Sequence, residues 1–366
     1  MALQCGIVGL PNVGKSTIFN ALTASSVPAE NYPFCTIDPN MGIVFIPDDR
    51  PGKIAELLKP QEVVLATVEF LDIAGLVKGA SRGEGLGNKF LGHIREVEAI
   101  IHVVRCFEDD NIAHVDETIN PVRDVQVIET ELLLRDIESI EKRISKSEKA
   151  GRTGDKSARG EVEFLNKILP QMNAGTMARD IEIDEGHRAY MKSLFLLTSK
   201  PVLYVANVSE DEIIHAERGA ISQALFDYAE NEGNTAIRLC GELEMEIARM
   251  EDEDKILFLE EYHLPEPGLD KLIHCANKLL KLESFFTVNE KQAHAWTIQE
   301  GTTAPAAAGT IHTDFQHGFI KADVYTFEDL MFYKTEHALR EHGKIRQEGK
   351  EYIVQDGDIM LFKFNV

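Results

Sequence analysis

The chain has 366 residues, of which 44% are hydrophobic, and this length and composition suit two or three globular domains. Its formal net charge is -23, so nucleic-acid phosphates would be repelled unless basic side chains gathered locally. Non-specific coating of nucleic acid is therefore disfavoured. We expect no DNA partner, and any RNA partner should meet a local basic patch.

Membrane insertion and secretion are disfavoured as well. No run approaches the roughly 18 to 20 uncharged apolar residues of a membrane span, and the first residues, MALQCGIVGL, lack the basic start of a signal peptide. The five cysteines lie far apart with no C-x-x-C pair, which indicates reduced thiols rather than a zinc site or a disulfide framework. We expect a cytoplasmic protein that does not associate with membranes.

The first 120 residues alternate short apolar runs with helical patterns. Strands are predicted at LQCGIVG, GIVFI, TVEFLDIAG and AIIHVVRC, with helices from about Lys15 and from Phe90 to Val97. Continuous apolar strands separated by helices are typical of a parallel sheet that is covered on both faces. The predicted fold class is α/β.

A helical hairpin interrupts this rhythm. Residues 121–151 form a long, charged helical pattern, residues 151–160 are a polar tip, and the pattern is helical again from Glu161. The α/β rhythm then resumes with PVLYVANV, a helix around 220–231 and TAIRLCG. We therefore predict that the hairpin is inserted in the α/β domain.

The pattern changes again after Ser284. Short alternating segments such as HAWTIQEG, GFIKADVYTF and EYIVQDGDIMLFKF predict strands, and a helical pattern is limited to residues 326–340. The stretch TTAPAAAG, residues 302–309, is predicted to be a loop. A small domain of one sheet with helices fits this region best.

A phosphate-binding loop is the strongest motif. Gly9 to Ser16 reads GLPNVGKS, which matches G-x-x-x-x-G-K-S/T and lies between an apolar strand and a helix start. In such a loop the backbone N–H groups cradle phosphates, Lys15 reaches the β- and γ-phosphates, and the Ser16 hydroxyl ligates Mg²⁺. The alternative is a glycine-rich turn without a ligand. The predicted nucleotide contacts here are Asn12, Val13, Gly14, Lys15, Ser16 and Thr17.

Two further oxygen donors complete the predicted metal site. Asp72 follows the strand TVEF and should emerge beside the phosphate loop, where a carboxylate can contact Mg²⁺ directly or through water. Thr36, in the loop NYPFCTIDPN, is the candidate second hydroxyl ligand. Taken alone, the Asp would be a cap and the Thr a turn residue. The predicted Mg²⁺ ligands are Ser16, Thr36 and Asp72.

The segment that follows is suited to a switch. Residues 75–92 contain six glycines, so they would make a poor core and could order on a γ-phosphate; a passive surface loop is the alternative. Leu76 occupies the position where many GTPases place the glutamine that orients the attacking water. Because an aliphatic side chain cannot hold a water, this role must lie elsewhere.

With these motifs the chain resembles the Obg-like ATPases of the YchF type, which lack the catalytic glutamine. The resemblance covers essentially all 366 residues and includes GLPNVGKST, NYPFCTIDPN, DIAGLVKGAS, the helical hairpin and NVSE. It implies a P-loop, Obg-type G domain over 1–283 with a hairpin insertion over about 121–199. It also implies a β-grasp module, the TGS domain, over 284–366.

The resemblance also implies an activity and a catalytic residue. It implies a Mg²⁺-dependent ATPase that associates with the ribosome, with Lys15 and His114 as the catalytic residues. Residue chemistry supports His114 modestly, because it lies in a polar loop after a strand and an imidazole can orient water. A lone loop histidine is more often merely solvated.

The base preference depends on the segment YVANVSE. Guanine readers carry Asn-Lys-x-Asp, whereas this chain has Asn207, Val208, Ser209 and Glu210. Adenine presents an unprotonated N1, which would repel a carboxylate held at the Asp position, and Glu210 is longer than Asp and need not occupy it. Residue chemistry leaves ATP and GTP both open, and the resemblance favours ATP. The predicted base contacts are Asn207, Val208 and Glu210.

A basic island marks the hairpin. Residues 135–160 carry eight Lys or Arg against five acidic residues, whereas residues 284–366 carry eight basic and twelve acidic residues. Charge alone favours a solvated hairpin held by i, i+4 pairs. The resemblance instead implies contact with the ribosome, its large subunit included, through rRNA and ribosomal proteins. We expect the protein itself to be a monomer.

Asn12 raises the possibility of a second cation. Its side-chain oxygen could join phosphate oxygens in holding K⁺, or it could only stabilise its own loop. Two rivals to the ATPase hypothesis remain from the sequence. One is a GTPase with the same machinery, and the other is a binding module for which nucleotide is a static ligand, because residue 76 is not glutamine.

Overall fold

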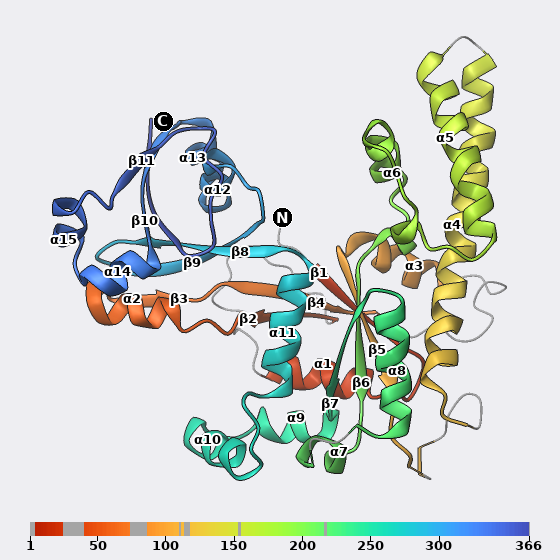
Figure 1. The fold of residues 1–366 in the computed structure, drawn as a ribbon, viewed down its shortest axis with the longest axis horizontal. Coiled ribbons are helices and arrows are strands. Elements are labelled where there is room, and N and C mark those ends of the chain that lie inside the picture. Colours follow the sequence, from red (N-terminus) through yellow and green to blue (C-terminus); the bar gives the residue numbers. More distant parts are fainter. Residues whose placement is uncertain are drawn as a thin grey trace. The chain divides into compact units, whose positions relative to one another are not determined.

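The structure is a computed structural model that describes residues 4–24, 40–73, 86–109, 111–112, 118–152, 155–215 and 218–365. The chain forms two compact units. Unit 1 comprises Met1–Gly42 and Glu69–Leu269, and unit 2 comprises Ile43–Val68 and Asp270–Val366. Each unit is built on one six-stranded sheet (Figure 1).

The sheet of the first unit has the strand order β2-β4-β1-β5-β6-β7. Strand β1 pairs in parallel with β4 and β5, and β6 pairs in parallel with β5 and β7. The central strands β5 and β6 are buried at every residue, as expected for apolar runs covered on both faces. The predicted α/β class is confirmed. The strands are β1 Gln4–Val8, β2 Met41–Phe45, β4 Thr67–Asp72, β5 Ala99–Arg105, β6 Val202–Asn207 and β7 Thr235–Leu239, and the segment 43–68 assigned to unit 2 begins within β2 and ends within β4.

Helices cover the faces of this sheet. Helix α4 contacts β5 and α8, and α8 contacts β6, while α1 contacts β1 and α9. The helices of unit 1 are α1 Lys15–Ala24, α3 Leu86–Glu96, α4 Pro121–Arg152, α5 Lys156–Asn173, α6 Arg188–Leu194, α7 Glu210–Ile214, α8 Ala220–Asn231, α9 Gly241–Ile247 and α10 Asp252–Glu261, with short 3₁₀ turns that include η3 Ala178–Asp180 and η5 Leu197–Ser199. Helix α11, Gly268–Leu279, begins in unit 1 and continues in unit 2.

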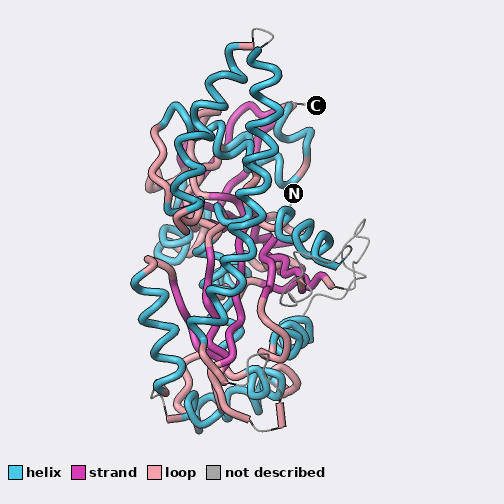
Figure 2. The backbone as a smooth tube through the Cα atoms, turned by 90° about the vertical axis from the view of Figure 1, so that its right-hand side faces the viewer, coloured by secondary structure: helices cyan, strands magenta, loops and turns pink. Residues whose placement is uncertain are grey.

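The predicted helical hairpin is present as α4 and α5, which run side by side in both views (Figures 1 and 2). Its apolar seam joins side chains of α4, such as Ile137 and Ile140, to side chains of α5, such as Phe164 and Ile168. Helix α5 begins where the Asp155 carboxylate accepts hydrogen bonds from two N–H groups of the first turn. The two helices therefore pack on each other along this seam, while Lys142, Lys146 and Lys149 on α4 are exposed.

Two buried carboxylates fix α4 to the rest of unit 1. Glu129 accepts hydrogen bonds from Tyr204 of β6 and Tyr228 of α8, each at 2.8 Å, and pairs with Arg179 at 2.6 Å. Asp136 accepts bonds from the N–H groups of Leu197 and Thr198 at 2.8 Å. Breaking such buried pairs on one side is costly, so the base of the hairpin is firmly tied to the sheet.

The second unit has a mixed sheet with the order β11-β10-β12-β8-β9-β3. Strands β8 and β9 pair antiparallel, β10 pairs antiparallel with β11 and β12, and β3 pairs in parallel with β9. The sheet-plus-helix prediction is confirmed. The elements are α2 Arg50–Leu58, β3 Glu62–Val64, β8 Leu282–Val288, β9 Gln292–Gln299, α12 Ala304–Ile311, α13 Thr313–His317, β10 Phe319–Thr326, α14 Phe327–Tyr333, α15 Glu336–Glu341, β11 Arg346–Glu348 and β12 Asp358–Phe364.

Two predictions in this unit were wrong. Residues 304–311 are helix α12 and not a loop, and α12 and α13 show that helix is not limited to residues 326–340. Proline in the first turn is tolerated, since the N–H groups there have no partner within the helix. Alanine is the best helix former, and Ala304, Ala307 and Ala308 are fully buried in the core of the unit. Small side chains let this helix pack closely on the sheet.

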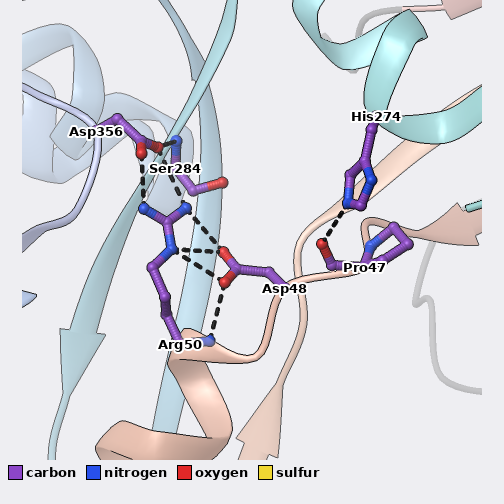
Figure 3. A network of polar contacts seen from close by, with 6 residues as sticks. All are labelled: Pro47, Asp48, Arg50, His274, Ser284 and Asp356. Atoms are coloured by element: carbon purple, nitrogen blue, oxygen red, sulfur yellow. Dashed lines mark hydrogen bonds and ion pairs between the residues drawn. The ribbon is translucent and has the colours of Figure 1, made fainter. Parts of the chain in front are cut away.

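The segment 43–68 was expected in the first domain, but it clusters with the carboxy-terminal residues. Within unit 2 the Arg50 guanidinium bonds both oxygens of Asp48 and both oxygens of Asp356 (Figure 3). His274 bonds the Pro47 carbonyl at 2.9 Å in the same view. The compact units thus divide the chain at other positions than 283/284, and the assignment of modules to 1–283 and 284–366 stays a prediction.

Two simpler expectations concern cysteines and membranes. Among the described residues, Cys5, Cys106, Cys240 and Cys275 form no disulfide, whereas Cys35 lies outside the described residues. Among the described helices, none is long and apolar enough to cross a bilayer.

Candidate nucleotide-binding site

A pocket of about 870 Å³ lies in unit 1 at the carboxyl ends of β1, β5, β6 and β7. This edge is where α/β sheets bind ligands, and the volume is typical of a small-molecule site. The loops after these strands line the pocket in sheet order. They are the phosphate loop, residues 107–109 with Ile112, residues 207–210 and residues 240–242.

The phosphate loop has the backbone that its sequence predicts. Gly14 has φ +89°, and a Cβ there would collide with Nδ2 of Asn207. Only glycine therefore fits at this position. Asn12 also has a positive φ, 62°, which asparagine tolerates better than most residues. Helix α1 then begins at Lys15, so its first N–H groups face the pocket as an anion site.

Lys15 and Asp72 meet in this pocket. The Lys15 ammonium forms an ion pair with Oδ1 of Asp72, and the side chains are 11% and 18% exposed. Ser16 lines the same pocket, so a hydroxyl and a carboxylate oxygen are available on the phosphate side. Oxygen donors of this kind are what Mg²⁺ prefers. The residues present therefore fit a magnesium ion shared with phosphate oxygens.

The charged side chains of the lining are mostly acidic. Asp72, Glu108, Asp109, Glu210 and Glu242 line the pocket, against Lys15 as the basic lining residue. Carboxylates repel a polyphosphate in the absence of countercharge. A nucleotide that enters with a divalent cation is therefore better suited to this pocket than free nucleotide.

Asn207 is a bridge between loops. Its side chain is 4% exposed, its Nδ2 donates to the Val13 carbonyl at 2.9 Å, and its Oδ1 accepts from the Gly241 N–H at 3.0 Å. These two bonds hold the phosphate loop against the loop after β7. Asn207 also lines the pocket, and its predicted contact with the base stays a prediction.

Val208 and Glu210 follow along the same wall. Val208 is 1% exposed and lines the pocket, and its N–H donates to the Leu239 carbonyl at 3.0 Å. Glu210 is exposed and begins α7. Of the two backbone groups at Val208, the carbonyl is thus the one that could accept a bond from an adenine amine.

Sequence reasoning missed two parts of the lining. Phe107, Glu108, Asp109 and Ile112 follow β5, and Cys240, Gly241 and Glu242 follow β7. The order of the parallel strands could have predicted these loops, because loops that follow neighbouring strands meet at one edge of the sheet. Burial raises the pKa of the Cys240 thiol, so it stays protonated and serves as an apolar wall.

The structure brings together nine of the predicted residues. Val13, which is buried, joins them through its carbonyl bond to Asn207. Thr36, His114 and residues 74–85 lie outside the described residues, so their predicted roles stay predictions. The predicted residues that line the pocket are Asn12, Gly14, Lys15, Ser16, Thr17, Asp72, Asn207, Val208 and Glu210.

Comparisons with known proteins bear on the whole chain. Residues 4–135 match a family described as 50S ribosome-binding GTPase, and residues 282–365 match the YchF-GTPase_C family, described as a protein of unknown function. The chain is 50% identical over 366 residues, 100% of both chains, to proteins named Ribosome-binding ATPase YchF from Escherichia coli O157:H7 and Bacillus subtilis (strain 168). A solved structure of the Schizosaccharomyces pombe YchF GTPase is 38% identical with a TM-score of 0.89, and the match covers 99% of this chain and 97% of that one.

Proposed function

Since the chain belongs to the YchF family of ribosome-binding ATPases, we propose that it is a Mg²⁺-dependent ATPase that binds the ribosome. It hydrolyses ATP in preference to GTP, and its nucleotide state alters its contact with the ribosome. The observation that carries the proposal is the pocket at the strand ends of unit 1, in which the Lys15–Asp72 pair faces the phosphate loop.

Phosphate binding and metal binding are linked in this proposal. A bound triphosphate competes with Asp72 for the Lys15 ammonium, because phosphate oxygens carry more charge at the loop. Ser16, Asp72 and Thr36 are the proposed holders of Mg²⁺, which would supply positive charge beside the phosphates when bound. Asp72 would then hold the metal, and the Lys15 ammonium would be available to the phosphates. K⁺ near Asn12 is proposed as a further cation.

The loop chemistry supports adenine over guanine. Guanine is read by a carboxylate that accepts from N1–H and the exocyclic amine. Glu210 is exposed at the start of α7, and Asn207 is bonded to backbone on both sides. The backbone carbonyl of the buried Val208, which lines the pocket, is an acceptor that suits an adenine amine.

Binding of labelled ATP and GTP to the purified protein, with Mg²⁺ present, tests the base preference. We expect tighter binding of ATP. The family that matches residues 4–135 and the fission yeast protein are both called GTPases, so GTP is the specific rival. A large preference for GTP would overturn the proposed base preference and leave the phosphate site intact.

Turnover distinguishes an enzyme from a static nucleotide binder. We propose that His114 acts on the attacking water, so His114→Ala should retain nucleotide binding and lose multiple-turnover hydrolysis. Unchanged hydrolysis in that variant would remove His114 from the mechanism. Absence of turnover in the wild type, with and without ribosomes, would favour the static binding module.

The hairpin is the proposed rRNA contact. Lys142, Lys146 and Lys149 are exposed and lie at i, i+4 and i+7 on α4, so they share one face. Arg143 is different, because it pairs with the buried Glu161 of α5 at 2.8 Å and holds the hairpin together. A lysine stripe on a rigid hairpin can follow a phosphate backbone even though the whole chain is acidic.

Charge reversal tests this contact. Replacing Lys142, Lys146 and Lys149 with Glu should weaken co-sedimentation with ribosomes and flatten its salt dependence, since fewer counterions are released. The matched control replaces Lys271, Lys291 and Lys350 of unit 2, which are also exposed, and changes the net charge equally. Equal loss of ribosome binding in the two variants would show that the effect comes from the net charge of the protein and not from the hairpin. Unchanged sedimentation of the hairpin variant would remove the contact.

A further inference from the structure

A buried arginine lies beneath the nucleotide pocket. Arg105 is the last residue of β5 and is 1% exposed. Its guanidinium donates three hydrogen bonds to backbone carbonyls, from Nε to Phe107 at 3.1 Å, from Nη1 to Ile112 at 3.0 Å and from Nη2 to Asp109 at 3.1 Å. Its Cζ also lies 4.8 Å from the centre of the Phe107 ring. One side chain thus holds the described part of the loop at three points.

The loop it holds is a wall of the pocket. Phe107, Asp109 and Ile112 line the pocket. Asp109 closes a local turn, because its carbonyl accepts from the Ile112 N–H at 3.2 Å and its Oδ1 accepts from the Asn111 N–H at 2.8 Å. In sheet order this wall stands between the phosphate loop after β1 and the base segment after β6. A shift of the wall would therefore alter both ends of a bound nucleotide.

Stability alone does not account for this arginine. Burial of a guanidinium carries a desolvation penalty, and well-packed apolar residues often replace buried ionic groups without loss of stability. The three carbonyl bonds offset the penalty only in this loop geometry. Arginine's planar fork is suited to that task, whereas lysine would offer a single point of charge. The bonds therefore indicate that the position of the loop is what the side chain provides.

We propose that Arg105 is a positioning residue that fixes the loop after β5 against the nucleotide, and that this anchoring sets turnover more than nucleotide affinity. The inference rests on the proposed ATPase function, since the same loop continues in sequence to His114. The phosphate loop is built on β1 and α1 and shares none of the three anchoring bonds. Loss of Arg105 should accordingly leave phosphate binding in place.

The test compares Arg105→Met and Arg105→Lys with Arg179→Met. Arg179 is a matched control, because it is also a largely buried arginine of unit 1 but bonds Glu129, away from the pocket. We expect kcat for ATP to fall on the order of a hundredfold in Arg105→Met, the effect of a misplaced catalytic group. The Kd for ADP should change by a smaller factor. The kcat of Arg105→Lys should lie between those of the wild type and Arg105→Met. Arg179→Met should lower stability, because it breaks the buried pair with Glu129, but the folded protein should retain the wild-type kcat.

Hydrogen exchange gives a readout that does not depend on turnover. In Arg105→Met, amides of residues 106–112 should exchange faster in the ADP complex, while β6 and β7 stay protected. Unchanged exchange, or a wild-type kcat in the methionine variant, would overturn the proposal. If Arg105→Met does not fold, a wild-type kcat in Arg105→Lys would overturn the role of the planar guanidinium. A wild-type protein without ATP turnover would instead count against the proposed function, and exchange would still decide the role of Arg105.

Discussion

The two units each contain a prominent pair between a cation and a carboxylate, and the pairs differ in what surrounds them. In unit 1 the Lys15 ammonium bonds Oδ1 of Asp72 at the edge of an open pocket. In unit 2 the Arg50 guanidinium bonds two carboxylates, and Asp356 also accepts from the Ser284 N–H at 2.8 Å (Figure 3). The first pair borders a ligand site, and the second is a closed network.

The difference lies in the hydrogen-bonding capacity that each cation has left for a ligand. An ammonium has three donors and no fixed direction, so it can exchange one partner for another at little geometric cost. A guanidinium between two carboxylates has its fork matched on both sides, which raises the pKa of Arg50 and keeps it charged. Removing Lys15 should therefore change function, whereas removing Arg50 should change stability.

The largest expected effect comes from Lys15→Ala. We expect ATP affinity to fall on the order of a hundredfold or more, because a charge-assisted bond to phosphate is lost. The control is Lys53→Ala, which removes an exposed i, i+4 pair with Asp49 and should alter neither binding nor stability by much. Calorimetric titration with ATP and Mg²⁺ measures the affinity of both variants. Equal affinities of Lys15→Ala and the wild type would contradict the role of the phosphate loop.

Acid should destabilise unit 1 through His102. Burial lowers its pKa to about 4, from an ordinary value of 6.5, while Glu129 and Arg179 act in opposite directions. Between these values the unfolded chain binds the proton and the folded chain does not. The contribution of the neutral His102 to the free energy of unfolding is therefore complete above pH 6.5. It is lost as the pH falls toward 4, and the loss is roughly 3 kcal/mol.

Urea unfolding at several pH values, followed by circular dichroism, measures this loss. His102→Gln should flatten the dependence between pH 6.5 and 4. Unit 2 offers a comparison, because burial also lowers the pKa of His294 to about 4 and its ring stacks on Trp296 at 3.7 Å. Fluorescence of Trp296, the sole tryptophan of the chain, should change near pH 4. A change centred at pH 6.5 would show that His294 titrates as an exposed histidine.

The closed network of unit 2 should affect stability by a smaller amount. Arg50→Met leaves Asp48 and Asp356 without their shared cation, and we expect unfolding of this unit to be easier by about 1–3 kcal/mol. Trp296 fluorescence reports the unfolding of unit 2, because Trp296 lies in β9 of the sheet of that unit. ATP affinity should be unchanged. A double-mutant cycle with Asp356→Asn measures the coupling, and additive effects would show that the two side chains act independently.

The sequence predicted features whose information is local. The phosphate loop was predictable because GLPNVGKS fixes both turn and helix start, and the hairpin because α4 is long and charged. Residues 304–311 were misread as a loop because Pro305 and Gly309 were weighed as turn residues, although alanine is the best helix former. Arg105 was missed for a different reason. Its partners are backbone carbonyls, which every residue carries, so no side-chain pattern marks them.

The smallest expected effect distinguishes K⁺ from Na⁺ at Asn12. Its side chain could hold K⁺ between the phosphates, where a cation would stabilise charge in the transition state. Asn12 has φ 62°, so alanine there would strain the backbone, and Asn12→Gly is the cleaner removal of the side chain. We expect ATP turnover to be a few-fold faster in K⁺ than in Na⁺ at equal ionic strength, about 1 kcal/mol of barrier, and the glycine variant to show no difference. A site formed by the Asn12 oxygen and phosphate oxygens should favour one of the two cations by size. Equal rates of the wild type in the two salts would therefore contradict the K⁺ site and leave Lys15 and Mg²⁺ to neutralise the phosphates.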